Sequence, residues 1–187
     1  MALLSPHEFG PTVVAVVGAA VDDTLESFAT CGGVDVMSLR DREPDLASRR
    51  IRASSASLVV HDADPLEHVA AAWVELFQER ATLGALEAEI DAALDRFERG
   101  SVAMPDYYLV VEPDASDDEW LHWWCGALGR GAPRRVMPLA APAGSSDAGL
   151  GRVLSSLPTS RPWPEPATWL PDLAYDIPDR VGVRAGE

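Results

Sequence analysis

Two aspartates one residue apart follow a short apolar run near the middle of the chain. The run Leu58–Val60 is typical of a buried strand, and it leads through His61, Asp62 and Asp64 into Pro65. Proline is favoured at the first position of a helix, so the segment indicates a strand, a tight turn and a helix. Ligands of open α/β sheets bind beyond the C-terminal ends of the strands, and we therefore expect a site at this turn.

Carboxylates at such a turn can bind a hard cation, Mg²⁺ or Mn²⁺, which then holds a substrate phosphate. Asp22 follows the first predicted strand and Glu112 follows the fourth, so both lie at the same rim if the strands run parallel. One hypothesis is therefore a metal-dependent enzyme that acts on a phosphorylated or nucleotide-like substrate. Its predicted metal ligands are Asp62, Asp64, Asp22 and Glu112, and His61 is its predicted acid or base.

The same acidic residues also have a simpler explanation. Each of them follows a predicted strand and precedes a predicted helix. Asp64, Asp22 and Asp117 suit helix N-termini, where a carboxylate accepts hydrogen bonds from free backbone N–H groups and favours the helix dipole. Capping explains these residues without any cation, and we favour it over the metal site.

The strand ends lack the two commonest nucleotide-binding motifs of α/β proteins. Gly18 stands alone where a dinucleotide fingerprint needs three glycines, and no Gly-Lys-Ser or Gly-Lys-Thr sequence is present for a phosphate loop. There is also no Gly-X-Ser-X-Gly nucleophile motif. We therefore expect no cofactor, and only the enzyme hypothesis requires Mg²⁺ or Mn²⁺.

The tryptophans are the most unusual feature of the sequence. Trp120, Trp123 and Trp124 crowd one predicted helix, and Trp163 and Trp169 lie in a Pro-rich C-terminal segment. Exposed tryptophan is enriched at binding hot spots. The leading hypothesis is therefore a non-catalytic protein that binds a protein partner, or a second copy of itself, through these residues. Packing of the C-terminal segment on the helix would bury them instead, and we favour this over an open partner surface.

A third possibility is a pocket for an apolar small molecule. It would lie at the same rim of the sheet, lined by Trp73, Tyr107 or Trp120. Such pockets are mostly apolar and carry a few placed polar groups.

The composition narrows the partners and the compartment. The 187 residues carry a formal net charge of -15, and all 15 basic residues are arginine. This charge repels nucleic acid and anionic membranes, so we expect neither as a partner. No apolar run approaches the ~20 residues of a membrane span, and the N-terminus lacks a signal-peptide pattern. Cys31 and Cys125 fit a reduced cytoplasmic protein, and the exclusive use of arginine suggests a GC-rich bacterial genome.

Apolar runs alternate with helical patterns along the chain. The predicted strands are Thr12–Gly18, Val34–Leu39, Leu58–Val60, Asp106–Val111 and Arg135–Leu139. The predicted helices are residues 22–31, 65–99 as one helix or two, 117–128 and 146–157. The alternation predicts a three-layer, Rossmann-like α/β sheet of about five mostly parallel strands with flanking helices. We expect one domain over residues 1–157 and an extended Pro- and Trp-rich tail, residues 158–187, packed on it.

The segment Arg40–Arg52 leaves the direction of the next strand open. Its arginines are interleaved with acids, which predicts a polar surface loop with one helical turn near Asp45–Ser48. Because this is short for a crossover helix, a hairpin is a real alternative to a parallel connection.

Overall fold

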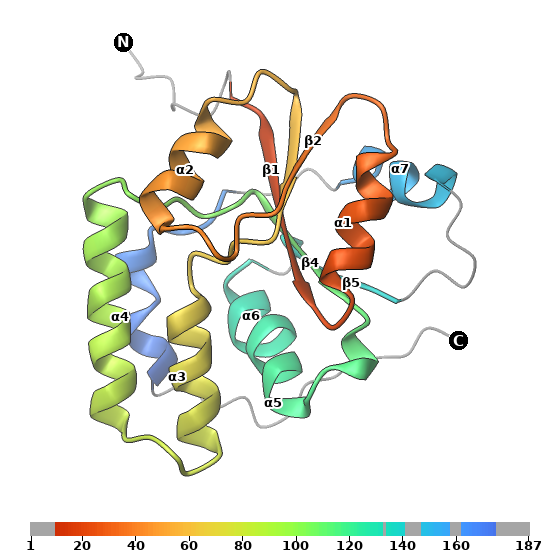
Figure 1. Ribbon diagram of the computed structural model, residues 1–187. Coiled ribbons are helices and arrows are strands. Elements are labelled where there is room, and N and C mark those ends of the chain that lie inside the picture. Colours follow the sequence, from red (N-terminus) through yellow and green to blue (C-terminus); the bar gives the residue numbers. More distant parts are fainter. Residues whose placement is uncertain (1–9, 133, 141–146, 158–161, 175–187) are drawn as a thin grey trace.

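The computed structural model describes residues 10–132, 134–140, 147–157 and 162–174 (Figure 1). The strands are β1 (Thr12–Gly18), β2 (Val34–Met37), β3 (Leu58–His61), β4 (Tyr107–Val111) and β5 (Val136–Leu139). The α-helices are α1 (Val21–Ala29), α2 (Pro44–Arg52), α3 (Glu67–Phe77), α4 (Leu83–Glu98), α5 (Asp118–Leu121), α6 (Gly129–Gly131) and α7 (Asp147–Ser155). The π-helix is η3 (His122–Leu128), and the 3-10 turns are η2 (Pro113–Ala115), η4 (Pro166–Thr168) and η5 (Pro171–Ala174).

The five strands form one sheet in the order β2-β3-β1-β4-β5, and every pair of neighbours is parallel. The predicted Rossmann-like α/β fold is thereby confirmed. β4 is buried along its whole length, as expected of an apolar strand covered on both faces, whereas β2 at the edge is mostly half-buried. The register aligns Met37, His61, Ala15 and Tyr108 in one row across the sheet, so their side chains share a face.

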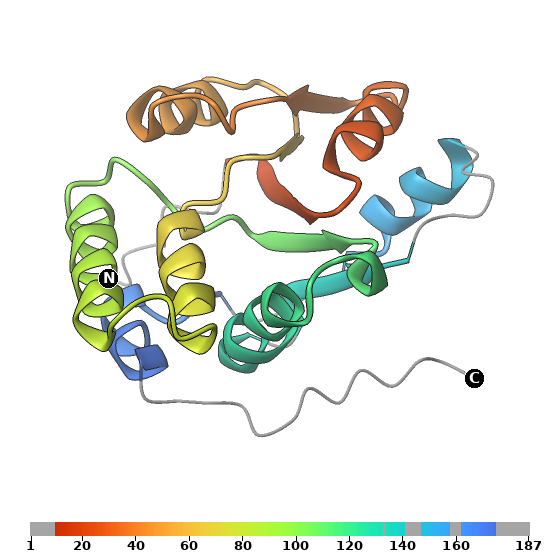
Figure 2. The same ribbon diagram turned by 60° about the horizontal axis from the view of Figure 1, so that its bottom comes forward.

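The strand order places helices on both faces of this sheet. The connection from β1 runs toward one edge and the next three run the other way, and right-handed crossovers then put their helices on opposite sides. α1 and α7 cover one face, over a core that includes Val14 and Phe28 (Figure 1). The other face carries α2, α3, α4 and the α5–η3–α6 helix over Ala15, Val59 and Tyr108, and Figure 2 shows α4, α3 and α5 side by side.

Helix α2 corrects the prediction of a polar loop with a single helical turn. It is a helix of 9 residues that begins at Pro44, and it connects β2 to a parallel β3 rather than to a hairpin partner. Its apolar contact is narrow, because Ala47 and the half-buried Ile51 are the residues that pack on Met37 and Val59. A stripe of two residues is too weak to stand out in a segment this rich in charge.

The helix with the clustered tryptophans is longer than predicted. The sequence predicted a break at Gly129, but the helix runs as α5, η3 and α6 through Gly131. The π-helical turns of η3 are wider than α-helical turns, and both Trp123 and Trp124 are buried, with 0% and 8% exposure. Gly129 serves packing rather than termination, because a Cβ there would lie 3.3 Å from the carbonyl oxygen of Trp124.

The long helical region is a hairpin of two helices, and the C-terminal segment packs beside it. The Thr82 hydroxyl caps α4 by accepting a hydrogen bond from the Ala85 N–H at 3.3 Å. Leu170 and Leu173 enter the same core as α4, and the Trp163 Nε1 donates to the Pro105 carbonyl at 2.7 Å. The predicted boundary between domain and tail adjoins residues 158–161, which lie outside the described residues. Within the described ranges, no helix has both the length and the apolar character needed to cross a bilayer.

Candidate functional site

A pocket of about 680 Å³ lies between α2 and the start of α3. Its floor includes Val13 and His61 from the sheet, and we call it the α2–α3 pocket. One wall is α2, and the opposite wall is the start of α3 with the connection from α4 to β4. The apolar lining includes Ala47, Ile51, Val102 and Met104, and the polar lining includes Ser48, His61, Asp64 and Arg96.

His61 is a buried polar residue in the pocket floor, with 3% of its surface exposed. Its Nδ1 accepts a hydrogen bond from the Ala63 N–H at 3.2 Å. Burial lowers the pKa of His61 to about 4, so the ring is neutral at physiological pH, and its proton resides on Nε2. Among the described residues, no group accepts this Nε2–H, which leaves a hydrogen-bond donor for a molecule in the pocket.

Asp64 is half-buried and lines the pocket where this adjoins a second hollow. Its Oδ1 accepts hydrogen bonds from the Leu66 N–H and from the Tyr108 hydroxyl, both at 2.9 Å. Burial raises the pKa of Asp64 to about 6, against the opposing effect of these two hydrogen bonds. A carboxyl with such a pKa exchanges its proton near neutral pH, and perturbed groups of this kind are enriched at functional sites.

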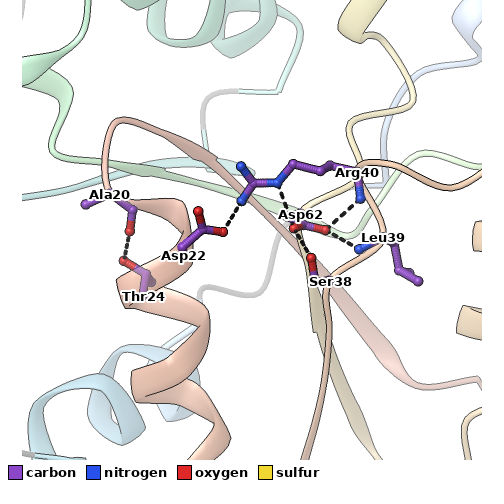
Figure 3. A network of polar contacts seen from close by, with 7 residues as sticks. All are labelled: Ala20, Asp22, Thr24, Ser38, Leu39, Arg40 and Asp62. Carbon is purple, nitrogen blue, oxygen red and sulfur yellow. Dashed lines mark hydrogen bonds and ion pairs between the residues drawn. The ribbon is translucent and has the colours of Figure 1, made fainter.

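Asp62 has the opposite environment, although only one residue separates it from Asp64. Its carboxylate accepts hydrogen bonds from the Ser38 hydroxyl at 2.9 Å, from the Arg40 N–H and Nε–H at 3.0 Å each, and from the Leu39 N–H (Figure 3). Arg40 also pairs with Asp22 of α1. Burial by itself raises the pKa of Asp62, but these hydrogen bonds outweigh it and hold the pKa below its ordinary value. We call this group of five residues the Asp62 cluster.

The predicted metal ligands are therefore not brought together as one shell. Arg40 joins Asp22 to Asp62, and it occupies the space that a cation between these carboxylates would need. Asp64 is bonded to Tyr108 instead, and Glu112 stands in a left-handed conformation with φ of 48° beyond β4. Over the described part of the chain, no three side chains of His, Cys, Asp or Glu are placed to hold a metal ion.

Of the three aspartates predicted to cap helices, Asp117 alone occupies the N-cap position. Asp117 occupies the N-cap position of α5, without a side-chain hydrogen bond to the helix. Asp22 lies in the first turn of α1, whose N-cap is Ala20. Asp64 accepts the Leu66 N–H in the turn before α3, so it orders the approach to the helix.

A second hollow of about 410 Å³ lies beyond the C-terminal ends of β1, β3 and β4. It shares Arg40, Asp64 and Glu67 with the α2–α3 pocket, and Trp120 forms part of its lining. Gly18 borders it with φ of 113°, where a Cβ would lie 2.2 Å from the Val111 carbonyl oxygen. This tight approach of two strand ends, rather than a phosphate loop, accounts for the single glycine.

The tryptophans predicted to bind a partner pack within the protein over the described residues. Trp123 is fully buried and lies 5.8 Å from Trp73, measured between ring centroids. Trp120 and Trp124 lie 5.3 Å apart, and Trp163 and Trp169 stack at 6.2 Å. All of these rings belong to, or pack against, the core on the α3–α4 face.

The sequence did not reveal the pocket residues Ser48 and Arg96. Ser48 belongs to α2, and Arg96 of α4 lines the pocket together with it. Because α2 forms one wall of the pocket, neither residue could be assigned to it before this helix was known. A full helix at Pro44–Arg52 was not predicted from the sequence. The feature that could have revealed it is Pro44, because proline is favoured at the first position of a helix.

Comparison of the chain with protein-family models, with curated proteins and with solved structures gave no significant match.

Proposed function

We propose that this protein binds a small organic molecule in the α2–α3 pocket. The observation that carries the proposal is His61, a buried polar side chain whose Nε2–H has no acceptor among the described residues and which lines a pocket of about 680 Å³. Polar groups of buried residues are almost always paired, so a donor of a buried side chain that is open to a pocket is a group that a ligand can complete.

The size and lining of the pocket support this function. Small-molecule sites are concave, enclose roughly 300–1,000 Å³ and are mostly apolar with a few convergent polar groups. The α2–α3 pocket combines apolar side chains such as Ile51 and Met104 with His61, Ser48 and Asp64. At β3 it lies at the C-terminal end, where ligands of open α/β sheets bind, and His61, Ala63 and Asp64 line it there. At β1 it lies at the N-terminal end, through Gly10, Pro11 and Val13.

Two of the three functions considered from the sequence, the metal-dependent enzyme and the protein-binding protein, have weaker support in the structure. A metal-dependent enzyme needs converging carboxylates, but Asp62 and Asp22 pair with Arg40, and Asp64 accepts the Tyr108 hydroxyl instead. Of the tryptophans predicted to bind a protein partner, Trp123 and Trp124 belong to the core on the α3–α4 face, and the other three are half-buried against it. A protein-binding role stays a prediction, whereas the pocket gives small-molecule binding a defined location.

Nile red, an uncharged apolar dye whose fluorescence rises in apolar surroundings, tests the pocket without regard to charge. We expect micromolar dye to bind the full chain with one site and to lose that site in Ser48→Phe. Ser48 is buried in the wall contributed by α2, so the added ring fills the pocket. Ser155→Phe on α7, on the opposite face of the sheet, is the matched control and should bind like the wild type.

Folding of both variants is checked by circular dichroism and by the midpoint of thermal unfolding. Equal dye binding by Ser48→Phe and wild type, with both folded, would show that the dye site lies elsewhere and would overturn the proposed pocket.

A further inference from the structure

We infer that the ligand of the α2–α3 pocket is a small organic acid with an apolar body, and that its carboxylate binds Arg96. The inference rests on the proposed function and specifies its chemistry. It comes from the one arginine of the pocket wall that is half-buried and has no partner among the described residues.

Arg96 lies in the last turn of α4 and lines the α2–α3 pocket. Its Nε is buried without a hydrogen-bond partner, and no carboxylate of the described residues forms an ion pair with its guanidinium. A buried N–H without a partner is costly, and a carboxylate is the group that a guanidinium binds best, through two parallel hydrogen bonds.

Other arginines near the pocket already have partners. Arg40 is bound by Asp62 and Asp22, and the Arg52 guanidinium donates to the Gly100 carbonyl at 3.2 Å across the gap between α2 and α4. Arg42 also lines the pocket but is exposed to solvent, where water satisfies it. Arg96 therefore offers the strongest attraction for an anion inside the pocket.

The position of Arg96 sets the orientation of the ligand. Arg96 also borders a neighbouring hollow with Arg49 and Arg99, whereas Asp64 borders the hollow beyond the strand ends. Arg96 and Asp64 therefore lie on the sides of the pocket that adjoin two different hollows. A carboxylate at Arg96 places the rest of the molecule over Met104 and Ile51. An acceptor atom beyond this apolar body would then meet the Nε2–H of His61.

The surrounding charge favours a carboxylate over a phosphate. Glu43 and Glu67 line the same pocket, and the whole chain carries a formal net charge of -15. A dianionic phosphate would face these acidic neighbours with twice the charge of a carboxylate. Arg96 is the half-buried guanidinium of the described pocket lining that could offset it, since Arg49 and Arg99 are exposed and border the neighbouring hollow. A single negative charge on an apolar body fits both Arg96 and its acidic neighbours.

The test compares 4-phenylbutanoate with its uncharged amide and with 4-phenylbutyl phosphate, each titrated into the full chain by calorimetry or ligand-observed NMR. We expect the acid to bind at least tenfold more tightly than the amide and the phosphate. We expect Arg96→Gln to weaken binding of the acid about tenfold and to leave the amide unchanged. Arg50→Gln is the matched control, since Arg50 is an exposed arginine of α2 that lines none of the three hollows described.

The other outcomes distinguish a failure of the carboxylate inference from a failure of the proposed function. Equal affinity for acid and amide, unaffected by Arg96→Gln but lost in Ser48→Phe, would overturn the carboxylate inference and leave the pocket intact. Tighter binding of the phosphate would likewise overturn the choice of carboxylate. Absence of any pocket-dependent binding, for all three probes and for Nile red, would overturn the proposed function itself.

Discussion

The Asp62 cluster and the α2–α3 pocket adjoin each other through Arg40, and they differ in whether their polar groups have hydrogen-bond partners within the protein. In the cluster, each oxygen of the Asp62 carboxylate accepts hydrogen bonds from Ser38, Leu39 or Arg40. In the pocket, the Nε2–H of His61 and the Nε of Arg96 have no protein partner among the described residues. Saturation is typical of buried polar groups that hold a fold together, whereas an unsatisfied donor in a pocket wall needs an explanation, and the one that we propose is a ligand.

The largest expected effect comes from Asp62→Ala, which tests whether the cluster is structural. The Asp62 side chain is 1% exposed and its removal leaves two backbone N–H groups and the Arg40 guanidinium without their acceptor. We expect a loss of about 3–5 kcal/mol in the free energy of unfolding, measured by urea denaturation.

Asp23→Ala is the matched control for this substitution, because Asp23 is exposed in the first turn of α1. It should change the free energy of unfolding by less than about 0.5–1 kcal/mol. A loss of similar size in both variants would show that the Asp62 cluster does not hold α1, β2 and β3 together.

The next effect is the pH dependence that His61 gives to the pocket floor. Burial lowers the pKa of His61 from 6.5 to about 4, so the unfolded chain takes up the proton first as pH falls. The stabilisation from the neutral ring is complete above pH 6.5 and is lost as pH falls toward 4. On going from pH 7 to pH 4, we expect the free energy of unfolding to fall by about 3 kcal/mol less in His61→Gln than in the wild type.

Asp64 should produce a slightly smaller effect of opposite sign over nearly the same range. Burial raises the pKa of Asp64 from 3.8 to about 6, so its contribution is complete below pH 3.8 and is lost as pH rises through 6. Asp64→Asn should therefore gain stability relative to wild type, by about 2–3 kcal/mol on going from pH 4 to 7. A difference between the two proteins that does not change with pH would contradict the raised pKa.

The sheet was predictable from the sequence, but the contrast between these two regions was not. β1 and β4 are continuous apolar runs, a pattern typical of strands that are buried on both faces of a sheet. The turns after them mark where the next helices begin. Strand order is not encoded locally, so the sequence could not show that Arg40, after β2, would reach Asp62 after the neighbouring β3.

The pocket could not be predicted, because two of its features leave no periodic pattern of apolar residues in the sequence. α2 packs through little more than Ala47 and Ile51, so a charged segment concealed a helix. From the sequence, Asp62 and Asp64 were equivalent candidates, since both lie in the same turn. Only the tertiary structure distinguishes them, because Asp62 pairs with Arg40 and Asp64 accepts the Tyr108 hydroxyl. Residue type and spacing drew attention to the turn after β3, whereas burial decides which side chains of that turn are paired within the protein.

The imidazole of His61 gives the most direct test of a pocket with an unpaired donor. In ¹⁵N-histidine-labelled full chain, assigned with His61→Gln, NMR reports the tautomer, the pKa and the response to 4-phenylbutanoate. We predict that His61 stays neutral down to about pH 5 with its proton on Nε2, and that this resonance shifts when the acid is added. A ring that titrates at its ordinary pKa of 6.5, and that ignores the acid, would contradict the central claim.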